Sequence, residues 1–290
     1  MLGETIRQKL HEGERVYGTH VCSLTNPVTA QMQSTLEYDF VFICNEHMPI
    51  DHTETSMLCQ FYAAKGVSPI VRIPAPVPHY AARALDEGAQ GIVAPYVETV
   101  EEVKALVGAV KYRPIKGEKL KGFLSGATQP SEKLAAFFDR FNRHNFLIIG
   151  IESYPAYERL EELITIPGVD GVFVGPHDLT CSMDIPEEYE HPEFRRVLED
   201  IIVRCERTGV GVGVHMSQLS TSLEGYLELI QKGMNYVLFG SDVGVLMKGM
   251  GDGLRTFREA MGDPFVAGTG ETNQPVASCL ATMARQGAEG

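Results

Sequence analysis

Apolar and polar positions alternate along this chain in two rhythms. Short apolar runs that are rich in β-branched and aromatic residues, and that end at glycine or proline, indicate strands buried on both faces, as in a parallel sheet. Stretches with apolar residues three and four positions apart lie between these runs and indicate amphipathic helices. Eight strands are predicted in this way, over residues 16–22, 39–44, 68–73, 91–94, 146–151, 172–174, 210–214 and 235–239.

The helical pattern fills the gaps between most of these strands. Eight strands that alternate with helices predict an α/β protein with a (β/α)8 TIM barrel as its single domain, over residues 1–262. A doubly wound open sheet fits less well, because it usually has about five to seven strands and a glycine-rich first turn. The predicted helices cover residues 1–14, 27–36, 53–64, 78–87, 99–110 and 131–141.

Two regions interrupt the alternation. Residues 111–145 form an insertion before the fifth strand, and residues 263–290 form a tail rich in Gly, Ala, Ser and Thr that is predicted to be flexible. The insertion opens with basic residues, which form either a solvated face or a cover for an anionic substrate at the mouth of the barrel. These residues are Lys111, Arg113, Lys116, Lys119 and Lys121.

Composition narrows the class of protein. The 290 residues are 44% hydrophobic and carry a net charge of −13, which argues against nucleic acid or an anionic membrane as a partner. No apolar run approaches the roughly 18 residues that span a bilayer. The six cysteines are far apart without a CxxC pair, and the first residues show no signal-peptide pattern. The sequence therefore predicts a soluble protein with reduced thiols in the cytoplasm.

Two predicted strands each deliver a carboxylate to the same edge of the barrel. Glu152 follows the strand 146–151, and Asp178 follows the strand 172–174 after a Gly-Pro pair that ends this strand. Active sites of parallel α/β barrels collect at this carboxyl edge. A single Asp at such a position is often only a helix cap, whereas two carboxylates together suit a hard divalent cation such as Mg²⁺.

The ends of the second and third strands add an imidazole and a guanidinium. His47 follows the second strand together with Glu46, and Arg72 lies near the end of the third strand. Taken alone, His47 could be a hydrogen-bonded structural residue and Arg72 an ion-pair partner. Together with a cation they supply a Lewis acid, an oxyanion donor and a base, which are the groups needed to stabilise an enolate.

Two other chemistries are disfavoured. The sequence has no Gly-x-Ser-x-Gly elbow for a Ser-His-Asp hydrolase, and no Lys ends a sixth-strand-like run to serve as the nucleophile of a Schiff-base aldolase. His20 and His215 are two further imidazoles that can face the mouth of the barrel.

Several motifs resemble those of the HpcH/HpaI family of metal-dependent (class II) 2-oxo acid aldolases. The likeness runs from about residue 18 to residue 246, and its most specific block is Gly168–Leu179, with the sequence GVDGVFVGPHDL. The other similar segments are Asn45-Glu46-His47, Val71-Arg72-Ile73-Pro74, Leu85-Asp86-Glu87-Gly88-Ala89, Ile151-Glu152-Ser153 and Gly240-Ser241-Asp242.

The resemblance implies a role for five of these residues. Glu152 and Asp178 would hold Mg²⁺, Mn²⁺ or Co²⁺, which chelates the carboxylate and 2-oxo group of pyruvate or oxaloacetate. Arg72 would steady the enolate oxygen, and His47 would transfer protons together with Asp86 of a neighbouring subunit. Because Asp86 ends a predicted helix near the bottom of its own barrel, it can reach only the mouth of another chain. We therefore expect a homo-oligomer built from dimers, a hexamer by resemblance.

Three positions depart from the pattern of that family. Cys44 stands where the family usually has Asp, Gly150 where it has Gln, and His177 where it has Ala or Asn. The loss of a negative charge and the gain of an imidazole both favour a substrate more anionic than pyruvate. Residues 17–27 and 44–49 are also similar to a branch of the family that makes citrate from oxaloacetate and acetyl-CoA for siderophore assembly.

Three functions stay open from the sequence. The leading one is citrate synthesis from oxaloacetate and acetyl-CoA, the second is an ordinary aldolase that cleaves 4-hydroxy-2-oxo acids, and the third is a barrel that binds a carboxylate without turnover. In the citrate interpretation Arg72 and the cation hold oxaloacetate, and Gly175, Pro176 and His177 lie against the substrate. Basic residues of the insertion, Lys121 among them, would help His177 to offset the remaining carboxylate or the phosphates of CoA.

Overall fold

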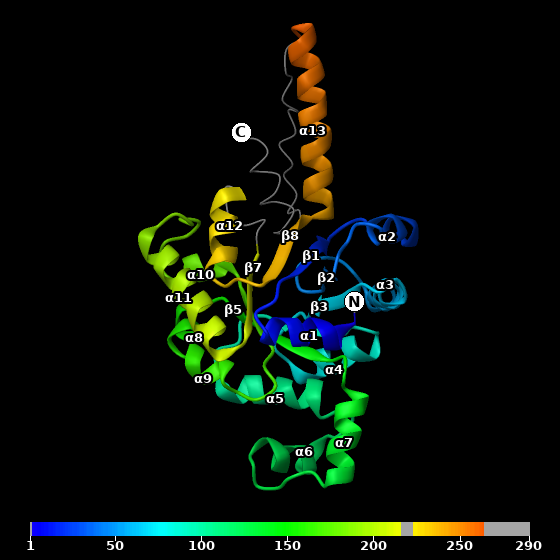
Figure 1. Ribbon diagram of the computed structural model, residues 1–290, viewed down its shortest axis with the longest axis vertical. Coiled ribbons are helices and arrows are strands. Elements are labelled where there is room, and N and C mark those ends of the chain that lie inside the picture. Colours follow the sequence, from blue (N-terminus) through cyan, green and yellow to red (C-terminus); the bar gives the residue numbers. More distant parts are fainter. Residues whose placement is uncertain (1, 216–222, 264–290) are drawn as a thin grey trace.

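The computed structural model describes residues 2–215 and 223–263, and its centre is a barrel of eight parallel strands (Figure 1). The strands neighbour one another in the order β7-β6-β5-β4-β3-β2-β1-β8. The predicted (β/α)8 TIM barrel with a single domain is confirmed. The strands are β1 (Val16–Val21), β2 (Phe40–Cys44), β3 (Ser68–Arg72), β4 (Gly91–Ala94), β5 (Phe146–Ile151), β6 (Gly171–Val174), β7 (Gly211–Val214) and β8 (Tyr236–Ser241).

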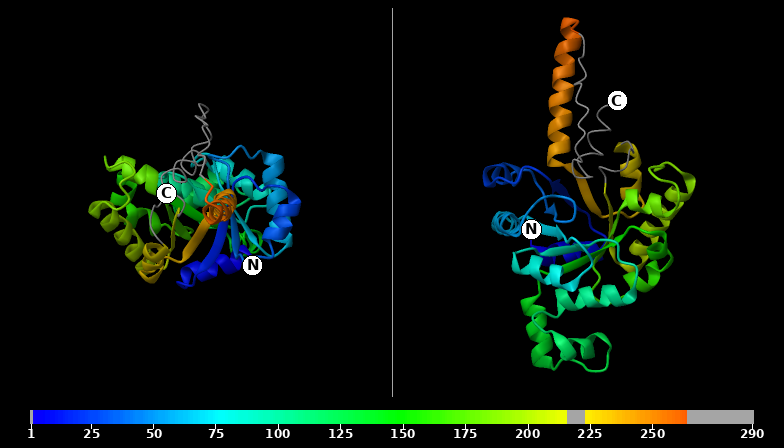
Figure 2. Two further views of the ribbon diagram at one scale, coloured as in Figure 1. Left: turned by 90° about the horizontal axis from the view of Figure 1, so that it is seen from above. Right: turned by 180° about the vertical axis from the view of Figure 1, so that it is seen from behind.

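Most of the helices form an outer layer around the strands, which Figure 2 shows from above. Several begin where the sequence supplies a cap. In α5 (Val100–Lys111), Thr99 and Glu102 form a reciprocal capping box. The remaining helices, capped or not, are α1 (Gly3–His11), α2 (Pro27–Gln33), α3 (His52–Ala64), α4 (Pro78–Asp86), α6 (Gly117–Leu124), α7 (Glu132–Phe141), α8 (Tyr154–Glu158), α9 (Leu160–Ile164), α10 (Pro176–Ser182), α11 (Pro192–Thr208), α12 (Leu223–Gln231) and α13 (Asp242–Met261).

Asn235 closes the ring between β7 and β8. Its N–H donates to the Val212 carbonyl of β7 over 3.0 Å, and its Oδ1 accepts the Val212 N–H over 2.9 Å. Its side-chain nitrogen also donates to the Leu10 carbonyl of α1 over 3.0 Å. A side-chain amide thus takes the place of a ladder hydrogen bond at the point where the two end strands of the sheet meet.

Aromatic rings fill the barrel at the amino ends of its strands. Phe40 of β2 stacks on Tyr236 of β8 with ring centroids 4.5 Å apart. Gly18 of β1 faces Phe40, and a Cβ at this glycine would lie only 2.4 Å from the Phe40 ring. This end of the barrel is therefore a packed core, and an active site can lie only at the carboxyl ends of the strands.

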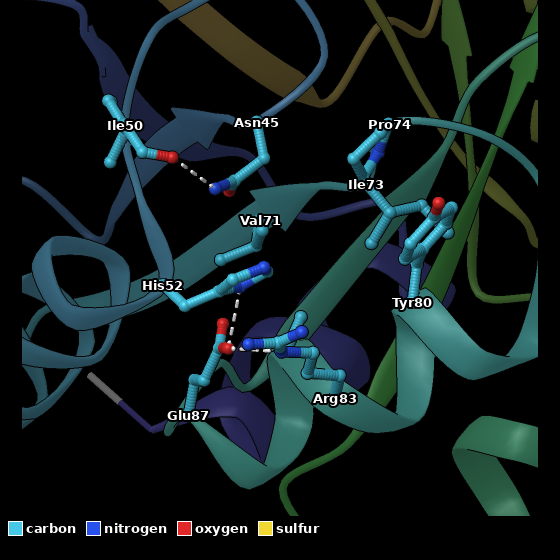
Figure 3. Close-up of a pocket in the computed structure, with 10 residues that line it drawn as sticks. Asn45, Ile50, His52, Val71, Ile73, Pro74, Tyr80, Arg83 and Glu87 are labelled. Atoms are coloured by element: carbon cyan, nitrogen blue, oxygen red, sulfur yellow. Dashed lines mark hydrogen bonds and ion pairs between the residues drawn. The ribbon is translucent and has the colours of Figure 1, made fainter.

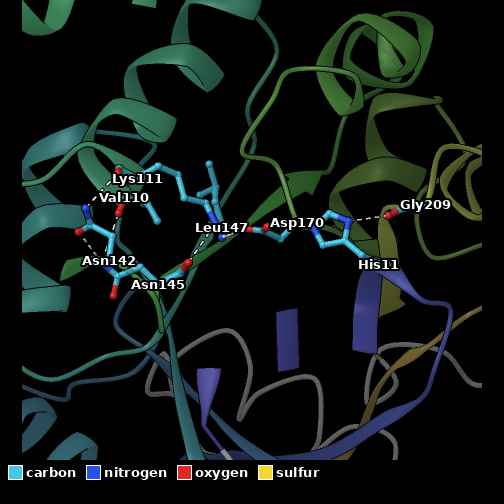
Figure 4. Close-up of polar contacts among 8 residues, drawn as sticks. All are labelled: His11, Val110, Lys111, Asn142, Asn145, Leu147, Asp170 and Gly209. Atoms are coloured by element: carbon cyan, nitrogen blue, oxygen red, sulfur yellow. Dashed lines mark hydrogen bonds and ion pairs between the residues drawn. The ribbon is translucent and has the colours of Figure 1, made fainter. Parts of the chain in front are cut away.

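Asp170, which precedes β6, ties together three elements below the barrel (Figure 4). Its carboxylate contacts Lys111 Nζ at the end of α5 over 2.6 Å and His11 Nε2 of α1 over 3.0 Å, and it accepts the Leu147 N–H over 2.8 Å. Burial alone would raise the pKa of Asp170, but Lys111 and His11 hold it below its ordinary value. Lys111, the first residue of the basic run, is therefore a structural ion-pair partner.

The insertion lies at the end of the barrel opposite the mouth. Helix α6 packs on α5, so that a Cβ at Gly108 would lie 3.0 Å from Leu124. Figure 1 shows α6 and α7 at the far end of the molecule from α13. Of the two roles open for the basic run, a solvated face or a cover for the mouth, the structure does not place the run over the mouth of its own chain. The run follows α5, which returns the chain to the amino ends of the strands, and Lys121 pairs with Glu118 over 2.8 Å in solvent.

Helix α13 leaves β8 and projects beyond the mouth of the barrel, as Figures 1 and 2 both show. Of the tail predicted to be flexible, residues 264–290 lie outside the described residues. Among the residues that the structure describes, no helix is long and apolar enough to cross a membrane.

Candidate active site

The carboxyl ends of β2, β3 and β5 bring three of the predicted residues together. His47 follows β2, Arg72 is the last residue of β3, and Glu152 directly follows β5. Asp178 lies in the first turn of α10, which begins two residues after β6 ends. Parallel strands end at a common edge, so all four side chains start from the mouth of the barrel.

Arg72 stands at the centre of this group and is only 6% exposed. Its Nε lies 2.9 Å from Glu46 Oε2 and donates to Cys44 Sγ over 3.3 Å, and its Nη1 lies 3.7 Å from Glu152 Oε1. Burial would lower the pKa of Arg72, but Cys44, Glu46 and Glu152 together raise it above its ordinary value. The guanidinium is therefore a fixed positive charge between two carboxylates.

Glu152 is a buried carboxylate with a raised pKa. Burial raises its pKa to about 7; Arg72 opposes the rise, whereas Glu46 and Asp178 add to it. Its Oε2 accepts the backbone N–H of Tyr96 over 3.1 Å, and its Oε1 has no hydrogen-bond partner among the described residues. A buried carboxylate oxygen left in this state is suited to bind a cation.

Asp178 completes the negative side of the site. Its side chain is exposed, and its charge raises the pKa of both Glu46 and Glu152, which places it within electrostatic range of these two carboxylates. Crowding of like charges around Glu152 would be relieved by a divalent cation, so the donor set fits such an ion. Among the described residues no group of three or more His, Cys, Asp or Glu side chains forms a cage for a metal. Two carboxylates alone would leave the other coordination positions to water and substrate.

Gly175 makes room for the Glu152 carboxylate. It is the N-cap residue of α10, and a Cβ at this position would lie 2.9 Å from Glu152 Cγ and 3.1 Å from Glu152 Oε1. The Gly-Pro pair that ends β6 therefore does more than stop the strand. It lets the helix that carries Asp178 approach Glu152 closely.

His47 is a neutral imidazole at the rim of the site. Burial lowers its pKa to about 4, and Arg72 lowers it further while Asp178 opposes the shift. Its Nε2 lies 3.7 Å from Glu46 Oε2, and its backbone N–H donates to Cys44 Sγ over 3.4 Å. At neutral pH the ring is therefore unprotonated, which is the form in which a general base acts.

Three other predicted residues lie outside this cluster. His177 is partly exposed on α10, where its Nδ1 lies 3.5 Å from the Tyr189 hydroxyl and 3.8 Å from Glu187 Oε1. The Asp86 side chain is 72% exposed at the end of α4 and forms an ion pair with Arg113 of the insertion. Within the chain, the structure brings neither Asp86 nor Lys121 to the mouth.

His20 and His215 lie inside the barrel. Their ring centroids are 5.5 Å apart in an edge-to-face arrangement, and His20 also packs against Phe42 at 5.1 Å. His20 of β1 pairs with Phe42 of β2, and Cys44, two residues after Phe42, pairs with Arg72 of β3. His20 therefore lies one layer of interior side chains below Cys44 and Arg72. Burial lowers the pKa of His215 to about 3 and that of His20 well below its usual value. Both rings are therefore neutral parts of the floor under the site.

A pocket of about 130 Å³ lies on the outer side of the same strand ends (Figure 3). Val71 precedes Arg72 in β3, and side chains alternate along a strand, so Val71 points away from the catalytic cluster. The Asn45 side chain donates to the Ile50 carbonyl over 3.1 Å and to the Thr55 hydroxyl over 2.8 Å. At the edge of the pocket Glu87 Oε1 binds His52 Nδ1 over 2.9 Å and Arg83 Nε over 3.0 Å. The predicted catalytic residues do not line this pocket, so we separate it from the active site.

Three contacts of the site were not predicted from the sequence. From the sequence, Glu46 was named only as a neighbour of His47. In the structure, Glu46 forms the shorter of the two ion pairs that Arg72 makes in the site, the other being with Glu152. Cys44 was noted as a departure from a family pattern, and its sulfur accepts hydrogen bonds from both Arg72 and His47. Only the unusual run of residues 44–47 signalled either role. The backbone of Tyr96, which holds Glu152, left no signal in the sequence.

Known proteins similar to this chain share its fold and much of its length. Residues 21–249 match the family described as HpcH/HpaI aldolase/citrate lyase. The chain is 27% identical over 269 residues to 2-keto-3-deoxy-L-rhamnonate aldolase of Escherichia coli K12, which covers 93% of this chain and 98% of that protein. The structure of the present chain is similar to that of an HpcH/HpaI aldolase from Desulfitobacterium hafniense DCB-2, with a TM-score of 0.74 and 26% identity. The match covers 91% of this chain and 98% of that one.

The fold is also that of the citrate synthase SbnG, with a TM-score of 0.74, 23% identity and coverage of 89% of this chain and 99% of that one. The chain therefore belongs to the HpcH/HpaI aldolase/citrate lyase family and is an aldolase-type lyase.

Proposed function

We propose that this enzyme forms the enolate of a 2-oxo acid or thioester and makes or breaks a carbon-carbon bond through it. The observation that supports the proposal most is the position of Arg72, a buried cation held between Glu46 and Glu152 at the mouth of the barrel. A fixed positive charge in a low-dielectric site stabilises negative charge that develops on a substrate oxygen.

The carboxylates Glu152 and Asp178 would hold a divalent cation, Mg²⁺ in the first place and Mn²⁺ or Co²⁺ as substitutes. When bound, this cation supplies a Lewis acid that polarises the 2-oxo group of the substrate. The buried Oε1 of Glu152, which has no hydrogen-bond partner among the described residues, and the like charge of Asp178 support this assignment.

His47 is the base of the proposed mechanism. Its neutral ring lies beside Glu46 and within electrostatic range of Arg72, so it can take a proton from the carbon next to the carbonyl group of the 2-oxo acid or thioester that forms the enolate. We propose that Asp86 of a neighbouring subunit orients this imidazole. Asp86 is exposed at the end of the barrel opposite its own mouth, which supports a role in another chain of a homo-oligomer. Mixing inactive His47→Ala with inactive Asp86→Ala would then restore part of the activity.

For the substrates we propose oxaloacetate, acetyl-CoA and water, giving citrate and free CoA. The acetyl methyl group loses a proton, the resulting enolate adds to the 2-oxo carbon of oxaloacetate, and water cleaves the thioester to release the thiol. Cys44 places a sulfur beside Arg72 where the family usually has a carboxylate, and His177, although its ring lies outside the cluster, directly precedes Asp178 in the sequence where the family usually has Ala or Asn. Both features favour a substrate with an additional carboxylate. With the insertion at the other end of the barrel, Lys121 of the same chain is no longer proposed to bind this substrate.

The second candidate is cleavage of a 4-hydroxy-2-oxo acid to pyruvate and an aldehyde. It is favoured by the likeness to 2-keto-3-deoxy-L-rhamnonate aldolase over nearly the whole chain. Mass spectrometry and thiol release would separate the two functions, with oxaloacetate plus acetyl-CoA in one reaction and pyruvate plus a panel of aldehydes in the other. Thiol release with a product of the mass of citrate supports the first function. Aldol products without thiol release would leave the second.

A further inference from the structure

The pocket on the outer side of the strand ends combines an apolar interior with a charged edge (Figure 3). It lies between the loop that follows β2, the end of β3 and helix α4. Its volume of about 130 Å³ is close to that of a cavity of about 150 Å³ that holds a benzene ring, so a short side chain fits inside. The buried apolar residues that line it are Ile50, Val71, Ile73 and Ala84.

Asn45 presents a polar atom without a partner in this pocket. Its side-chain nitrogen donates to the Ile50 carbonyl and to the Thr55 hydroxyl. Because a carbonyl oxygen only accepts hydrogen bonds, the atom that faces Ile50 is the amide nitrogen, which fixes the orientation of the amide. Its Oδ1 is buried and has no hydrogen-bond partner among the described residues. A buried acceptor of this kind needs a donor from a bound molecule.

Two opposite charges stand side by side at the edge of the pocket. Arg83 Nε donates to Glu87 Oε1 over 3.0 Å, and His52 Nδ1 lies 2.9 Å from the same oxygen. The side chains of Arg83 and His52 are 45% and 53% exposed, so this edge opens to solvent. The contact uses only one nitrogen of the guanidinium and one oxygen of the carboxylate. The terminal nitrogens of Arg83 and the Oε2 of Glu87 are therefore available to a bound molecule.

We infer that this pocket binds a small α-amino acid whose side chain carries a hydroxyl. The carboxylate of the ligand lies on Arg83 and its ammonium group on Glu87, because a zwitterion matches one charge of each sign. A simple carboxylate would face the like charge of Glu87, and a simple amine would face that of Arg83. The side chain of the ligand enters the apolar interior, where its hydroxyl donates to Asn45 Oδ1.

Such a ligand would be an effector and not a substrate, because the predicted catalytic residues do not line the pocket. The pocket nevertheless touches the catalytic loop. Asn45 directly precedes Glu46 and His47, and its backbone N–H donates to the Arg72 carbonyl over 2.9 Å. A ligand on Asn45 would thus restrain the loop that carries the proposed base. The inference concerns binding alone and does not depend on which substrate the enzyme uses.

The probe is L-threonine, titrated into the full chain by isothermal titration calorimetry, and we expect saturable binding. L-Valine has the shape of threonine without the hydroxyl. It would leave Asn45 Oδ1 unpaired, so its affinity should be lower by about tenfold. 3-Hydroxybutyrate, which is threonine without the ammonium group, should also bind more weakly, since its carboxylate meets the charge of Glu87 without compensation.

Variants of the charged edge test the site itself. Arg83→Gln and Glu87→Gln should each lower the affinity for L-threonine by about tenfold or more, because each removes a charged hydrogen-bond partner. Lys104→Gln on α5 removes an exposed charge outside the pocket and is the matched control. Glu152→Gln alters the active site and should bind L-threonine as the wild type does. Circular dichroism would establish that each variant is folded.

Four results would overturn the inference. The first is a wild type that takes up no L-threonine at millimolar concentration, which would mean that the pocket holds water only. The second is equal affinity for L-threonine and L-valine. The third is undiminished binding by both Arg83→Gln and Glu87→Gln. The fourth is loss of binding in Glu152→Gln, which would place the amino acid in the active site.

Discussion

At the residue scale, the geometry of the active site depends on the glycine at position 175, which has no Cβ. Gly175 leaves the space in which the Glu152 carboxylate lies, since a Cβ there would come within 2.9 Å of Glu152 Cγ. The backbone at Gly175 is extended, with φ of −95°, so an alanine is tolerated by the backbone itself. The effect of a substitution should therefore fall on the carboxylate and not on the fold.

We expect Gly175→Ala to lower kcat/KM by roughly 10-fold or more, because displacement of a positioned catalytic group by a fraction of an ångström has effects of this size. Steady-state kinetics with any accepted 2-oxo acid would measure the loss, and the melting temperature should change little. Gly249→Ala, at a position with open space around it, is the control. A Gly175→Ala enzyme with the kcat/KM of the wild type would show that Glu152 need not lie where the structure places it.

The sequence predicted the main residues of the site but not the contacts between them. Arg72, Glu152 and His47 were found because each lies at the end of an apolar run, and parallel strands end at one edge. The bond from the Tyr96 N–H to Glu152 depends on a backbone with φ of 33° at Tyr96, which no local pattern announces. The partners of Cys44 likewise follow from how β2 and β3 pair, and not from its neighbours in sequence.

At the element scale, one buried carboxylate joins α1, α5 and the start of β6. Lys111 and His11 both contact Asp170, and the side chain of Asp170 is only 4% exposed. Removal of one partner from a buried ion pair leaves the other charge buried without compensation. The three elements should therefore lose their common anchor when the charge of Asp170 is removed.

We expect Asp170→Asn to lower the free energy of unfolding by about 3 kcal/mol, the usual cost of breaking a buried pair. Urea denaturation at pH 7 would measure this, with Asp252→Asn as the control because it breaks only an exposed pair on α13. Equal stability of the two variants would contradict the structural role of Asp170.

Element boundaries were predictable where the apolar pattern was long enough. The predicted helix over 53–64 and the observed α3 (His52–Ala64) differ by one residue, because the capping residue Asp51 and the periodic pattern agree. The helices α8 and α9 have five residues each, too few for a helical period to be visible. The insertion was found, but its position below the barrel follows from the direction of α5 and was overlooked.

At the scale of the whole molecule, two buried imidazoles should make the barrel sensitive to acid. His20 and His215 have pKa values lowered in the folded state, mainly by burial, to about 3 for His215. The unfolded chain takes up protons on both rings below about pH 6.5, whereas the folded chain does not. Their contribution to stability is complete above pH 6.5 and is lost as the pH falls toward 3.

We expect the free energy of unfolding to fall by about 1.4 kcal/mol per pH unit for each of these rings below pH 6. His11 acts in the opposite direction, since its hydrogen bond to Asp170 raises its pKa. A His20→Phe variant isolates the effect, because it removes one ring from the floor and leaves His11 in place. Urea titrations at pH 7.5, 6.5 and 5.5 should give a shallower slope for the variant. Parallel slopes would show that His20 is not neutral in the folded barrel.

The fold as a whole was readable from the sequence, because eight β-rich runs separated by helical patterns allow few other architectures. The direction of α13 was not readable. A helix after β8 is expected to pack on its own barrel, whereas α13 projects beyond the mouth (Figure 1).

The central claim is that Glu152, Asp178 and Arg72 form a metal-dependent site that creates an enolate. Exchange of the C3 hydrogens of pyruvate for deuterium in D₂O, followed by proton NMR, measures enolate formation without any assumption about the second substrate. Pyruvate is the probe because its methyl signal disappears as exchange proceeds. The protein would be treated with a chelator, dialysed and assayed with and without added Mg²⁺.

We predict exchange by the wild type with Mg²⁺, its loss after chelation and its recovery when Mg²⁺ or Mn²⁺ is added back. Arg72→Ala should slow the exchange at saturating pyruvate by roughly 10²-fold, because the guanidinium acts on charge that develops only in the enolate. Glu152→Gln should abolish the exchange at every Mg²⁺ concentration tested. Exchange that persists undiminished in the chelated enzyme, or in Glu152→Gln, would contradict the account.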